Sequence, residues 1–229
     1  MISVVIPTLN AEAGLTATLS ALVPATVQGL VREVVISDGG SEDGTSEIAD
    51  IAGAEFVVSE KGRGAQLAAG AEHARSDWLL FLHADTVLQS GWEQEAATFM
   101  ERVDSGARPL AAAAFSFALD DFGAKPRMLE TFVGLRCALF HIPYGDQGLL
   151  IPKRLYSSLG GYRPLPLMED VDLVRRLGRR RLVMMRSKAV TSAVRYKRDG
   201  YFARMARNLA CLLLYYMRVS PATLTRIYG

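Results

Sequence analysis

The chain has 229 residues, of which 50% are hydrophobic and 22% are charged, and its formal net charge is +2. This is the composition of a globular protein, and the balanced charge gives no reason to expect a nucleic-acid partner. Cys137 and Cys211 lie in apolar helical contexts, so we expect buried free thiols rather than disulfides or a zinc site. Without a signal-peptide pattern or an apolar run of roughly 18 residues, we expect a cytoplasmic protein.

Strands and helices alternate over the first hundred residues. Short apolar runs that end at turn residues indicate buried strands, and the segments between them have helical spacing. This alternation is typical of a doubly wound α/β unit, and no internal repeat or low-complexity linker interrupts it. The expected strands are 2–6, 33–36, 55–58 and 78–82, and the expected helices are 12–22, 45–52 and 62–74.

The second half of the chain is less regular. Its apolar patterns predict further helices and short strands, the last of which, 183–185, we expect at an edge of the sheet. The other expected strands are 111–119 and 148–152, and the expected helices are 90–103, 128–140, 168–181 and 201–219, the last followed by Ser220-Pro221.

The strand at 78–82 ends in His83-Ala84-Asp85. An apolar run of this kind indicates a strand buried on both faces of a parallel sheet, and ligands bind beyond the carboxyl ends of such strands. A carboxylate at that position can hold a divalent cation, which in turn can hold a phosphate. Alone, Asp85 would be read as a turn or helix-capping residue.

Polar loops follow the first two strands as well. Pro7-Thr8-Leu9-Asn10 offers a hydroxyl, an amide and backbone groups, and Asp38 could accept hydrogen bonds from a base or from ribose. The glycines of 39–45 let backbone approach a ligand closely, although a tight strand-to-helix loop is the alternative reading. The glycine fingerprint of a dinucleotide site is absent after the first strand.

Three further segments carry chemistry. Gly62-Arg63-Gly64 places a cation and backbone amides at a helix N-terminus, where phosphate is favoured. The acidic loop 144–148 precedes a strand. Glu169 and Asp170 open a helix, where they either complement the helix dipole or supply a general base that takes a proton from an attacking hydroxyl. We favour Asp170 as that base, with Glu169 next.

Taken together these segments resemble the family-2 inverting glycosyltransferases of the GT-A fold, an α/β fold with a mostly parallel central sheet, helices on both faces and here a C-terminal amphipathic helix. The resemblance covers nearly the whole chain in the expected order, and the set of motifs is more specific than any one of them. The motifs are 5–10, 37–45, 62–65, 83–85, 145–147 and 168–173.

The resemblance implies a nucleotide-diphosphate sugar donor, carrying UDP or GDP, and a hydroxyl acceptor. It divides a single domain, 1–229, into a nucleotide-binding half, 1–103, an acceptor and catalytic half, 104–198, and a C-terminal helix, 199–229. The donor residues carried over are Pro7, Thr8, Asn10 and Asp38 at the base and ribose, Arg63 there or at the phosphates, Ala84 beside them, and Arg195 at the diphosphate.

By the same resemblance Asp85 binds Mg²⁺ or Mn²⁺ and Asp170 is the base. The chain departs from the family at His83, where the metal motif normally begins with Asp, and at Tyr196, which replaces the Trp of processive synthases. Histidine can ligate Mn²⁺, but on a strand it is more often a packed, hydrogen-bonded residue. Because Tyr196 replaces the Trp of the processive synthases, polymer synthesis with export is not expected.

Two other functions fit part of this pattern. A sugar-nucleotidyltransferase shares the sheet topology but needs a basic glycine loop after the first strand, which the chain lacks. A non-catalytic nucleotide-sugar binder would keep Asp38 and Asp85 in use and tolerate the loss of Asp170. Acceptor-binding residues are expected in the irregular segment 115–144, where the pattern identifies none of them.

The segment 175–207 is rich in Arg and Lys, with Asp199 as its one acid, and the helix at 201–219 is basic and amphipathic. Such a helix packs its apolar face on the core or on a second subunit, as in a homodimer. Alternatively it docks on a membrane, on the inner face of the cell membrane for a cytoplasmic enzyme, which would suit a lipid acceptor.

Overall fold

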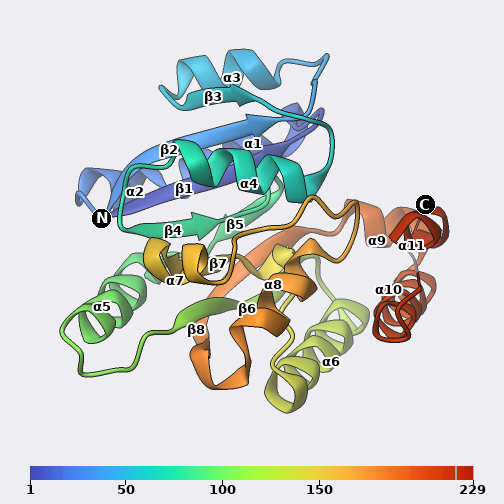
Figure 1. The fold of residues 1–229 in the computed structure, drawn as a ribbon. Helices are drawn as coiled ribbons and strands as arrows, with labels where there is room; N and C mark the ends of the chain where they lie inside the picture. The colour runs from blue at the N-terminus through green and yellow to red at the C-terminus, as the bar shows by residue number, and fades with distance from the viewer. Residues whose placement is uncertain (220, 229) are drawn as a thin grey trace.

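The structure, a computed structural model, describes residues 1–219 and 221–228, which fold around one mixed sheet (Figure 1). Within the described residues the sheet has eight strands in the order β3-β2-β1-β4-β7-β6-β8-β5. The α/β fold class is thereby confirmed. The strands are β1 (Ile2–Thr8), β2 (Val31–Asp38), β3 (Glu55–Val58), β4 (Trp78–Phe81), β5 (Thr86–Leu88), β6 (Ala112–Asp120), β7 (Leu149–Pro152) and β8 (Leu182–Ser192).

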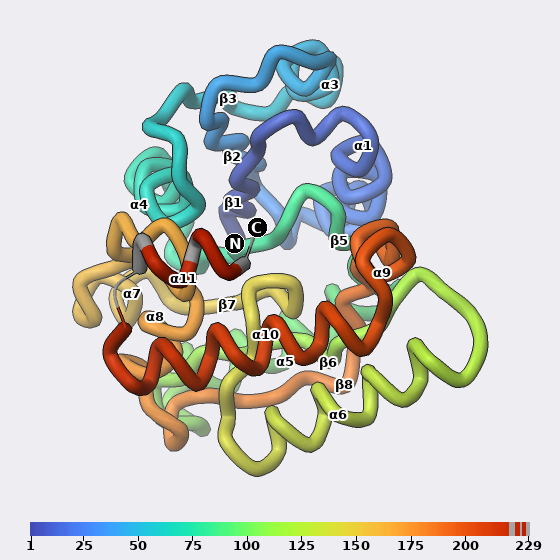
Figure 2. The backbone as a smooth tube through the Cα atoms, turned by 90° about the vertical axis from the view of Figure 1, so that its right-hand side faces the viewer, coloured from blue at the N-terminus to red at the C-terminus, as the bar shows by residue number. Residues whose placement is uncertain are grey.

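Helices cover both faces of the sheet and close its carboxyl end (Figures 1 and 2). They are α1 (Glu12–Ser20), α2 (Val23–Val27), α3 (Thr45–Ile51), α4 (Arg63–His73), α5 (Trp92–Asp104), α6 (Ala124–Phe140), α7 (Lys153–Ser158), α8 (Glu169–Leu177), α9 (Val194–Asp199), α10 (Tyr201–Tyr216) and α11 (Pro221–Tyr228), with short 3₁₀ turns η1 (Gly145–Gln147) and η2 (Arg179–Arg181).

The first four strands in space, β3, β2, β1 and β4, are parallel, as the alternation of strands and helices predicts. Pro7 does not end the first strand as expected, because β1 continues to Thr8, which pairs with Asp38. The pairing of β1 with β4 stops at Val5. The N–H that Pro7 lacks therefore falls beyond the ladder with β4, where proline is tolerated.

Beyond β4 the sheet becomes mixed. β7 is antiparallel to both β4 and β6, while β8 lies parallel to β6 and antiparallel to β5. The strand expected at 183–185 is part of the longer β8, which has 11 residues; residues 182–184 pair with β6 alone, and residues 189–191 also pair with β5, which is the last strand of the sheet. Polar residues such as Arg186 and Lys188 interrupt its apolar pattern and hid its length.

Alternate side chains of the central strands enter two separate cores, as the two-residue period of a strand requires. Val4 and Leu80 pack with α1 and α5 on one face, whereas Val5 and Phe81 pack with α4, α7 and α8 on the other. All four residues of β4 are buried. The prediction of a strand buried on both faces is confirmed.

The C-terminal region is more divided than expected. The single helix predicted at 201–219 is α10, which follows α9 after Gly200 at φ 84° and lies beside α6 (Figure 2). Ser220 lies outside the described residues, and α11 begins at Pro221. Similarly, the helix predicted at 168–181 ends at Leu177, because Gly178 adopts φ 80°. Within the described part of the chain, no helix is both long and apolar enough to cross a bilayer.

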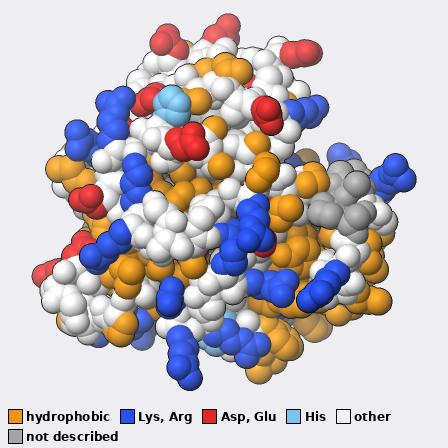
Figure 3. All heavy atoms as spheres, in the orientation of Figure 1, with side chains coloured by type: hydrophobic (Ala, Val, Ile, Leu, Met, Phe, Trp, Pro, Cys, Tyr) orange, Lys and Arg blue, Asp and Glu red, His pale blue; other side chains and the backbone are white. Residues whose placement is uncertain are grey.

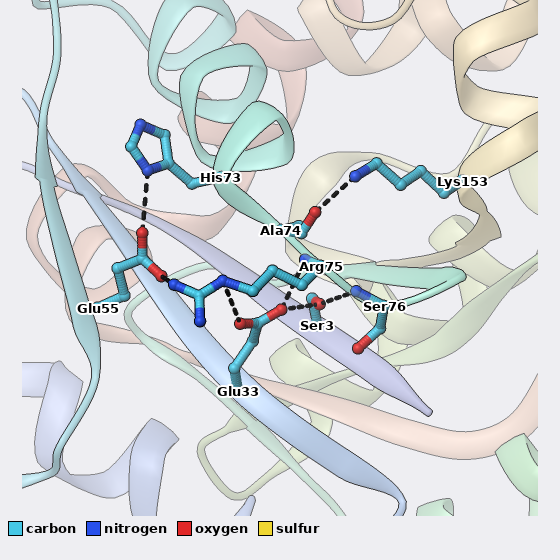
Figure 4. Close-up of polar contacts among 8 residues, drawn as sticks. All are labelled: Ser3, Glu33, Glu55, His73, Ala74, Arg75, Ser76 and Lys153. Atoms are coloured by element: carbon cyan, nitrogen blue, oxygen red, sulfur yellow. Dashed lines mark hydrogen bonds and ion pairs between the residues drawn. The ribbon is translucent and has the colours of Figure 1, made fainter.

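A polar network joins the amino ends of the parallel strands (Figure 4). Glu33 on β2 accepts hydrogen bonds from the hydroxyl of Ser3 on β1 and from the backbone N–H of Arg75. The Arg75 guanidinium reaches Glu55 at the start of β3, at 2.9 Å. These contacts connect three strands to the C-terminal end of α4. They lie at the amino ends of the strands, whereas the loops with predicted functional residues lie at the carboxyl ends.

Candidate functional site

A cavity of about 90 Å³ lies beyond the carboxyl end of β4, between the N-terminus of α8 and the helices α9 and α10. Five of the predicted site residues, Arg63, Asp85, Glu169, Asp170 and Arg195, line it. The structure therefore brings together residues separated by more than a hundred positions. The remaining lining residues are His83, Tyr144, Gly145, Asp146, Leu167, Met168, Thr191, Ser192, Tyr196, Arg204 and Asn208.

The turn that carries His83 and Asp85 packs against α1 on the side away from the cavity. The hydroxyl of Thr18 donates a hydrogen bond of 2.9 Å to the carbonyl of Ala84. Gly14 permits this contact, because a Cβ there would lie 2.9 Å from the same carbonyl oxygen. Ala84 thus contacts α1 and does not line the cavity, while His83 and Asp85 on either side of it do.

His83 is neutral in this setting. Burial lowers the pKa of His83 well below its usual value, and the positive charges of Arg63 and Arg195 lower it further. Its ring packs against Gly145, where a Cβ would lie 2.6 Å from Nε2. A neutral imidazole has a lone pair to offer to a metal ion or to a hydrogen-bond donor.

Asp170 is held at the start of α8 by backbone donors. Its Oδ2 accepts a hydrogen bond of 2.6 Å from the N–H of Gly145, and its Oδ1 accepts one of 2.7 Å from Val171. Met168, just before the helix, adopts a left-handed conformation with φ 66°. The loop before β7 and the first turn of α8 therefore meet at this carboxylate, which is the geometry expected of a positioned base.

Asp146, in the same loop, is a site residue that we did not single out from the sequence beyond its motif. Its Oδ1 is buried and has no hydrogen-bond partner among the described residues. Burial raises the pKa of Asp146 to about 6; Arg136 opposes the shift, and the negative charges of Asp170 and Asp85 add to it. Three carboxylates therefore share one electrostatic environment.

Glu169 lies behind Asp170 and is only 2% exposed. Burial, and after it the negative charge of the neighbouring Asp170, raise the pKa of Glu169 to about 7, while Arg63 opposes the shift. The Arg63 Nε lies 3.7 Å from a carboxylate oxygen of Glu169. This ion pair connects the N-terminus of α4 to that of α8.

One glycine of the motif around Arg63 has a packing role that the sequence did not indicate. A Cβ at Gly64 would lie 2.2 Å from the carbonyl oxygen of Arg163, so this glycine lets the 163–165 backbone pack against α4. Close approach by the chain itself therefore explains Gly64. Arg63, one position earlier, is the residue of this motif that lines the cavity.

The second wall of the cavity comes from α9 and α10. Arg204 is buried, forms an ion pair of 2.8 Å with Asp199, and lies over the ring of Tyr196 at 5.5 Å. Asn208, one turn later on α10, has a buried Oδ1 without a hydrogen-bond partner among the described residues. Neither Arg204 nor Asn208 belongs to a motif, and only the folded structure shows that they face the site.

The residues predicted to hold the base and ribose lie outside this cavity, at the carboxyl ends of β1 and β2. Asp38 already accepts four hydrogen bonds within the chain, from the Thr8 hydroxyl and from the backbone of Gly40 and both the backbone and hydroxyl of Ser41. Although burial opposes it, these hydrogen bonds lower the pKa of Asp38. Asn10 similarly accepts from the Glu42 N–H at 2.9 Å, and Pro7 is buried in β1.

The cavity fits a divalent cation only in part. Within the described residues, no group of three or more His, Cys, Asp or Glu side chains is arranged to hold a metal. However, Asp85 and a neutral His83 line the cavity beside the unpartnered Oδ1 of Asp146. Mg²⁺ is commonly held by one or two carboxylates together with substrate phosphates, so this donor set suits a cation that arrives with a diphosphate.

The first part of the chain matches a known family. Residues 3–112 match the model of glycosyl transferase family 2. No curated protein matches the sequence. Among solved structures, glucosyl-3-phosphoglycerate synthase from Mycobacterium tuberculosis, in complex with Mn²⁺, UDP and glucosyl-3-phosphoglycerate, is 22% identical, with a TM-score of 0.63 over 94% of this chain and 79% of that one.

A second similar structure is TarS from S. aureus, which is 17% identical, with a TM-score of 0.62 over 99% of this chain and 69% of that chain. At such identities the likeness shows the fold alone. The family match over residues 3–112 and the shared fold over nearly all of the chain agree with the motifs: residues 3–112 match glycosyl transferase family 2, and the chain has the GT-A fold.

Proposed function

We propose that the chain is an inverting glycosyltransferase that moves a sugar from a UDP- or GDP-sugar to a hydroxyl acceptor. The observation that carries this proposal is Asp170, whose carboxylate is fixed by the Gly145 N–H at the cavity that Asp85 and Asp146 also line. The family match favours glycosyl transfer over the sugar-nucleotidyltransferase alternative.

On this proposal the donor lies across the carboxyl ends of β1, β2 and β4. The nucleotide binds at the loops of Thr8, Asn10 and Asp38, and its diphosphate lies toward Asp85 and the Arg63 and Arg195 side chains. The M. tuberculosis synthase, solved with UDP and with Mn²⁺ or Mg²⁺, supports this type of donor. Since Asp38 is saturated by its own loop, it acts on the donor chiefly by shaping that loop.

The reaction is a single displacement. The acceptor oxygen forms a bond to the anomeric carbon as the bond from that carbon to the diphosphate breaks, and the diphosphate leaves with the electron pair. Asp170 takes the proton of the acceptor hydroxyl, and attack from the opposite face inverts the anomeric centre. Arg63 and Arg195 stand where they can offset the negative charge that develops on the diphosphate.

A divalent cation, Mg²⁺ or Mn²⁺, would neutralise the leaving diphosphate when bound. The residues of this chain that would hold it are Asp85 and His83, with Asp146 close by. Glu169 is the second candidate for the base, because its pKa of about 7 suits proton transfer near neutral pH. However, Glu169 is only 2% exposed and forms an ion pair with Arg63, so it is better suited to orient that arginine than to act as the base.

A thermal-shift screen with UDP, GDP and their sugars, each with and without Mn²⁺, tests the donor part of the proposal. We expect stabilisation by one nucleotide, larger with the metal, and an inverted anomeric configuration in the transferred product. Stabilisation that is independent of metal would leave the transferase reading standing and remove Asp85 as the metal residue. If no nucleotide stabilises the protein, the proposed donor class is wrong.

A further inference from the structure

The helices α6 and α10, which lie side by side, expose a continuous set of large apolar side chains. Along α10 these residues recur at helical spacing, and each is about half exposed. Figure 3 shows hydrophobic side chains gathered at the lower right, over these two helices. This α6–α10 face consists of Phe132 (51% exposed), Leu135 (53%) and Leu139 (63%) from α6, and Phe202 (58%), Leu209 (55%), Leu213 (56%) and Tyr216 (45%) from α10.

The helix α10 therefore has two distinct sides. One side carries buried residues, including Arg204 and Cys211, and contributes Asn208 to the wall of the cavity. The other side carries the exposed apolar stripe. Packing within the described chain covers only the first of these sides, so the apolar stripe is left for another partner.

The exposed charges of the segments that carry this face are all positive. In residues 122–140 and 194–219, all of which the structure describes, no Asp or Glu is exposed. The two acids there are engaged, Glu130 with Arg127 and Asp199 with Arg198 and Arg204. The exposed cations of the same segments are Lys125, Arg127, Arg195, Lys197, Arg198 and Arg218. Of these, Arg127, Lys197 and Arg198 form ion pairs with Glu130, Asp121 and Asp199, so Lys125, Arg195 and Arg218 carry most of the excess positive charge.

We propose that the α6–α10 face docks on the surface of an anionic lipid bilayer. Apolar side chains that enter the boundary between headgroups and acyl chains, surrounded by Lys and Arg, are the requirements for interfacial binding. A symmetric pairing of two copies through this face would instead place the same cations opposite each other. Anionic headgroups neutralise these cations, which is why the charge pattern favours the bilayer.

Docking in this orientation has a consequence for the site, which rests on the proposed function. Because the same helix lines the cavity through Arg204 and Asn208 on its other side, the docked protein holds its cavity about 10 Å from the lipid surface, one helix diameter away. An acceptor hydroxyl on an amphiphilic, lipid-anchored molecule would then reach Asp170 without leaving the membrane surface. The unpartnered Oδ1 of Asn208 is a hydrogen-bond acceptor suited to a hydroxyl of such a molecule.

Flotation of the full chain with vesicles tests the docking. We expect co-flotation with phosphatidylcholine vesicles that contain phosphatidylglycerol, weaker binding at high salt, and little binding to phosphatidylcholine alone. Leu209→Ser combined with Leu213→Ser is expected to weaken binding by at least about tenfold. Lys125→Glu combined with Arg218→Glu is expected to weaken binding to the anionic vesicles.

The matched control is Val27→Ser combined with Ile51→Ser, which changes side chains that are 81% and 86% exposed on α2 and α3, away from this face. This control should bind vesicles as the unchanged chain does. Melting temperatures and nucleotide-induced thermal shifts of all the variants show that they are folded and that donor binding, a separate property, is intact.

Failure of the unchanged chain to float with anionic vesicles would overturn the proposal. So would equal flotation by the Leu209→Ser and Leu213→Ser double variant. Sedimentation that shows a dimer which this double variant dissociates would identify a second copy as the occupant of the face and would also overturn it.

Discussion

The polar side chains at the two ends of the sheet differ in how they are hydrogen-bonded. At the amino ends of the parallel strands, Glu33 accepts from Ser3 and Arg75, and Arg75 in turn reaches Glu55. The buried hydroxyl of Ser76 in this network has no hydrogen-bond partner among the described residues, but no carboxylate there is left unpaired. At the carboxyl ends, Asp146 and Asn208 each have a buried oxygen without a hydrogen-bond partner among the described residues. The first arrangement joins strands together, whereas the second leaves groups available to a ligand.

This difference indicates where stability and function reside. A paired carboxylate stabilises the fold, but burial together with the negative charges of Asp170 and Asp85 raises the pKa of Asp146. A protein retains such a cluster at some cost in stability when a cation or substrate relieves it. Changes at the cavity should therefore reduce activity and spare the fold, and changes at the amino ends should do the reverse.

The largest expected effect is that of Asp170→Asn. An amide cannot take the acceptor proton, so we expect turnover to fall by about 10²- to 10⁴-fold, while the nucleotide-induced thermal shift is kept. Asp120→Asn, at an exposed position on β6, is the control and should leave turnover unchanged. Full activity in Asp170→Asn would rule it out as the base and point to Glu169.

The second effect is on the metal dependence of donor binding. With nucleotide at about 100 times Kd, a bound ligand stabilises the fold by about 2.7 kcal/mol. In Asp85→Asn we expect only the portion of this stabilisation that does not need Mn²⁺ to remain, because the carboxylate that would hold the cation is lost. Thermal shifts with and without Mn²⁺ measure this, and an unchanged metal increment would exclude Asp85 as a ligand.

The opposite end of the sheet should respond in stability alone. Glu33→Ala leaves the Ser3 hydroxyl and the Arg75 N–H without their acceptor, so we expect the free energy of unfolding to fall by about 2–3 kcal/mol. Glu47→Ala, at an exposed position on α3, should change it little. Denaturant titration measures both, and a loss of turnover in folded Glu33→Ala would contradict the separation of the two ends.

The parallel half of the fold was predictable because local signals agree with one another there. The apolar runs at 2–6 and 78–82 end at polar loops, and the structure confirms both strands. Signals in the second half conflict. The polar residues of β8 gave only the fragment 183–185, and β5 and α7 were not expected.

The site was partly predictable for a similar reason. Asp85 and Asp170 directly follow a strand or open a helix, so their sequence context predicts where they lie. The roles of Asp38 and Gly64 could not be predicted from such context, since both are explained by contacts with the chain's own backbone. Asn208 reaches the cavity only because α10 folds back over it, which no local pattern records.

The last expected effect is a dependence of stability on pH that comes from the cavity. The pKa of Glu169 is about 7 in the folded chain against 4.5 for an unperturbed carboxyl, so the folded state binds the proton more tightly. The free energy of unfolding should therefore fall as pH rises from about 4.5 to 7, by about 2–3 kcal/mol. Asp146, with a pKa of about 6, acts in the same direction.

Glu169→Gln should gain stability relative to the unchanged chain at pH 8 but not at pH 4.5, as measured by denaturant titration without metal or nucleotide. A variant that is less stable at both pH values would show that the ion pair with Arg63 outweighs the burial of the carboxylate, and that this part of the cavity behaves like the amino ends.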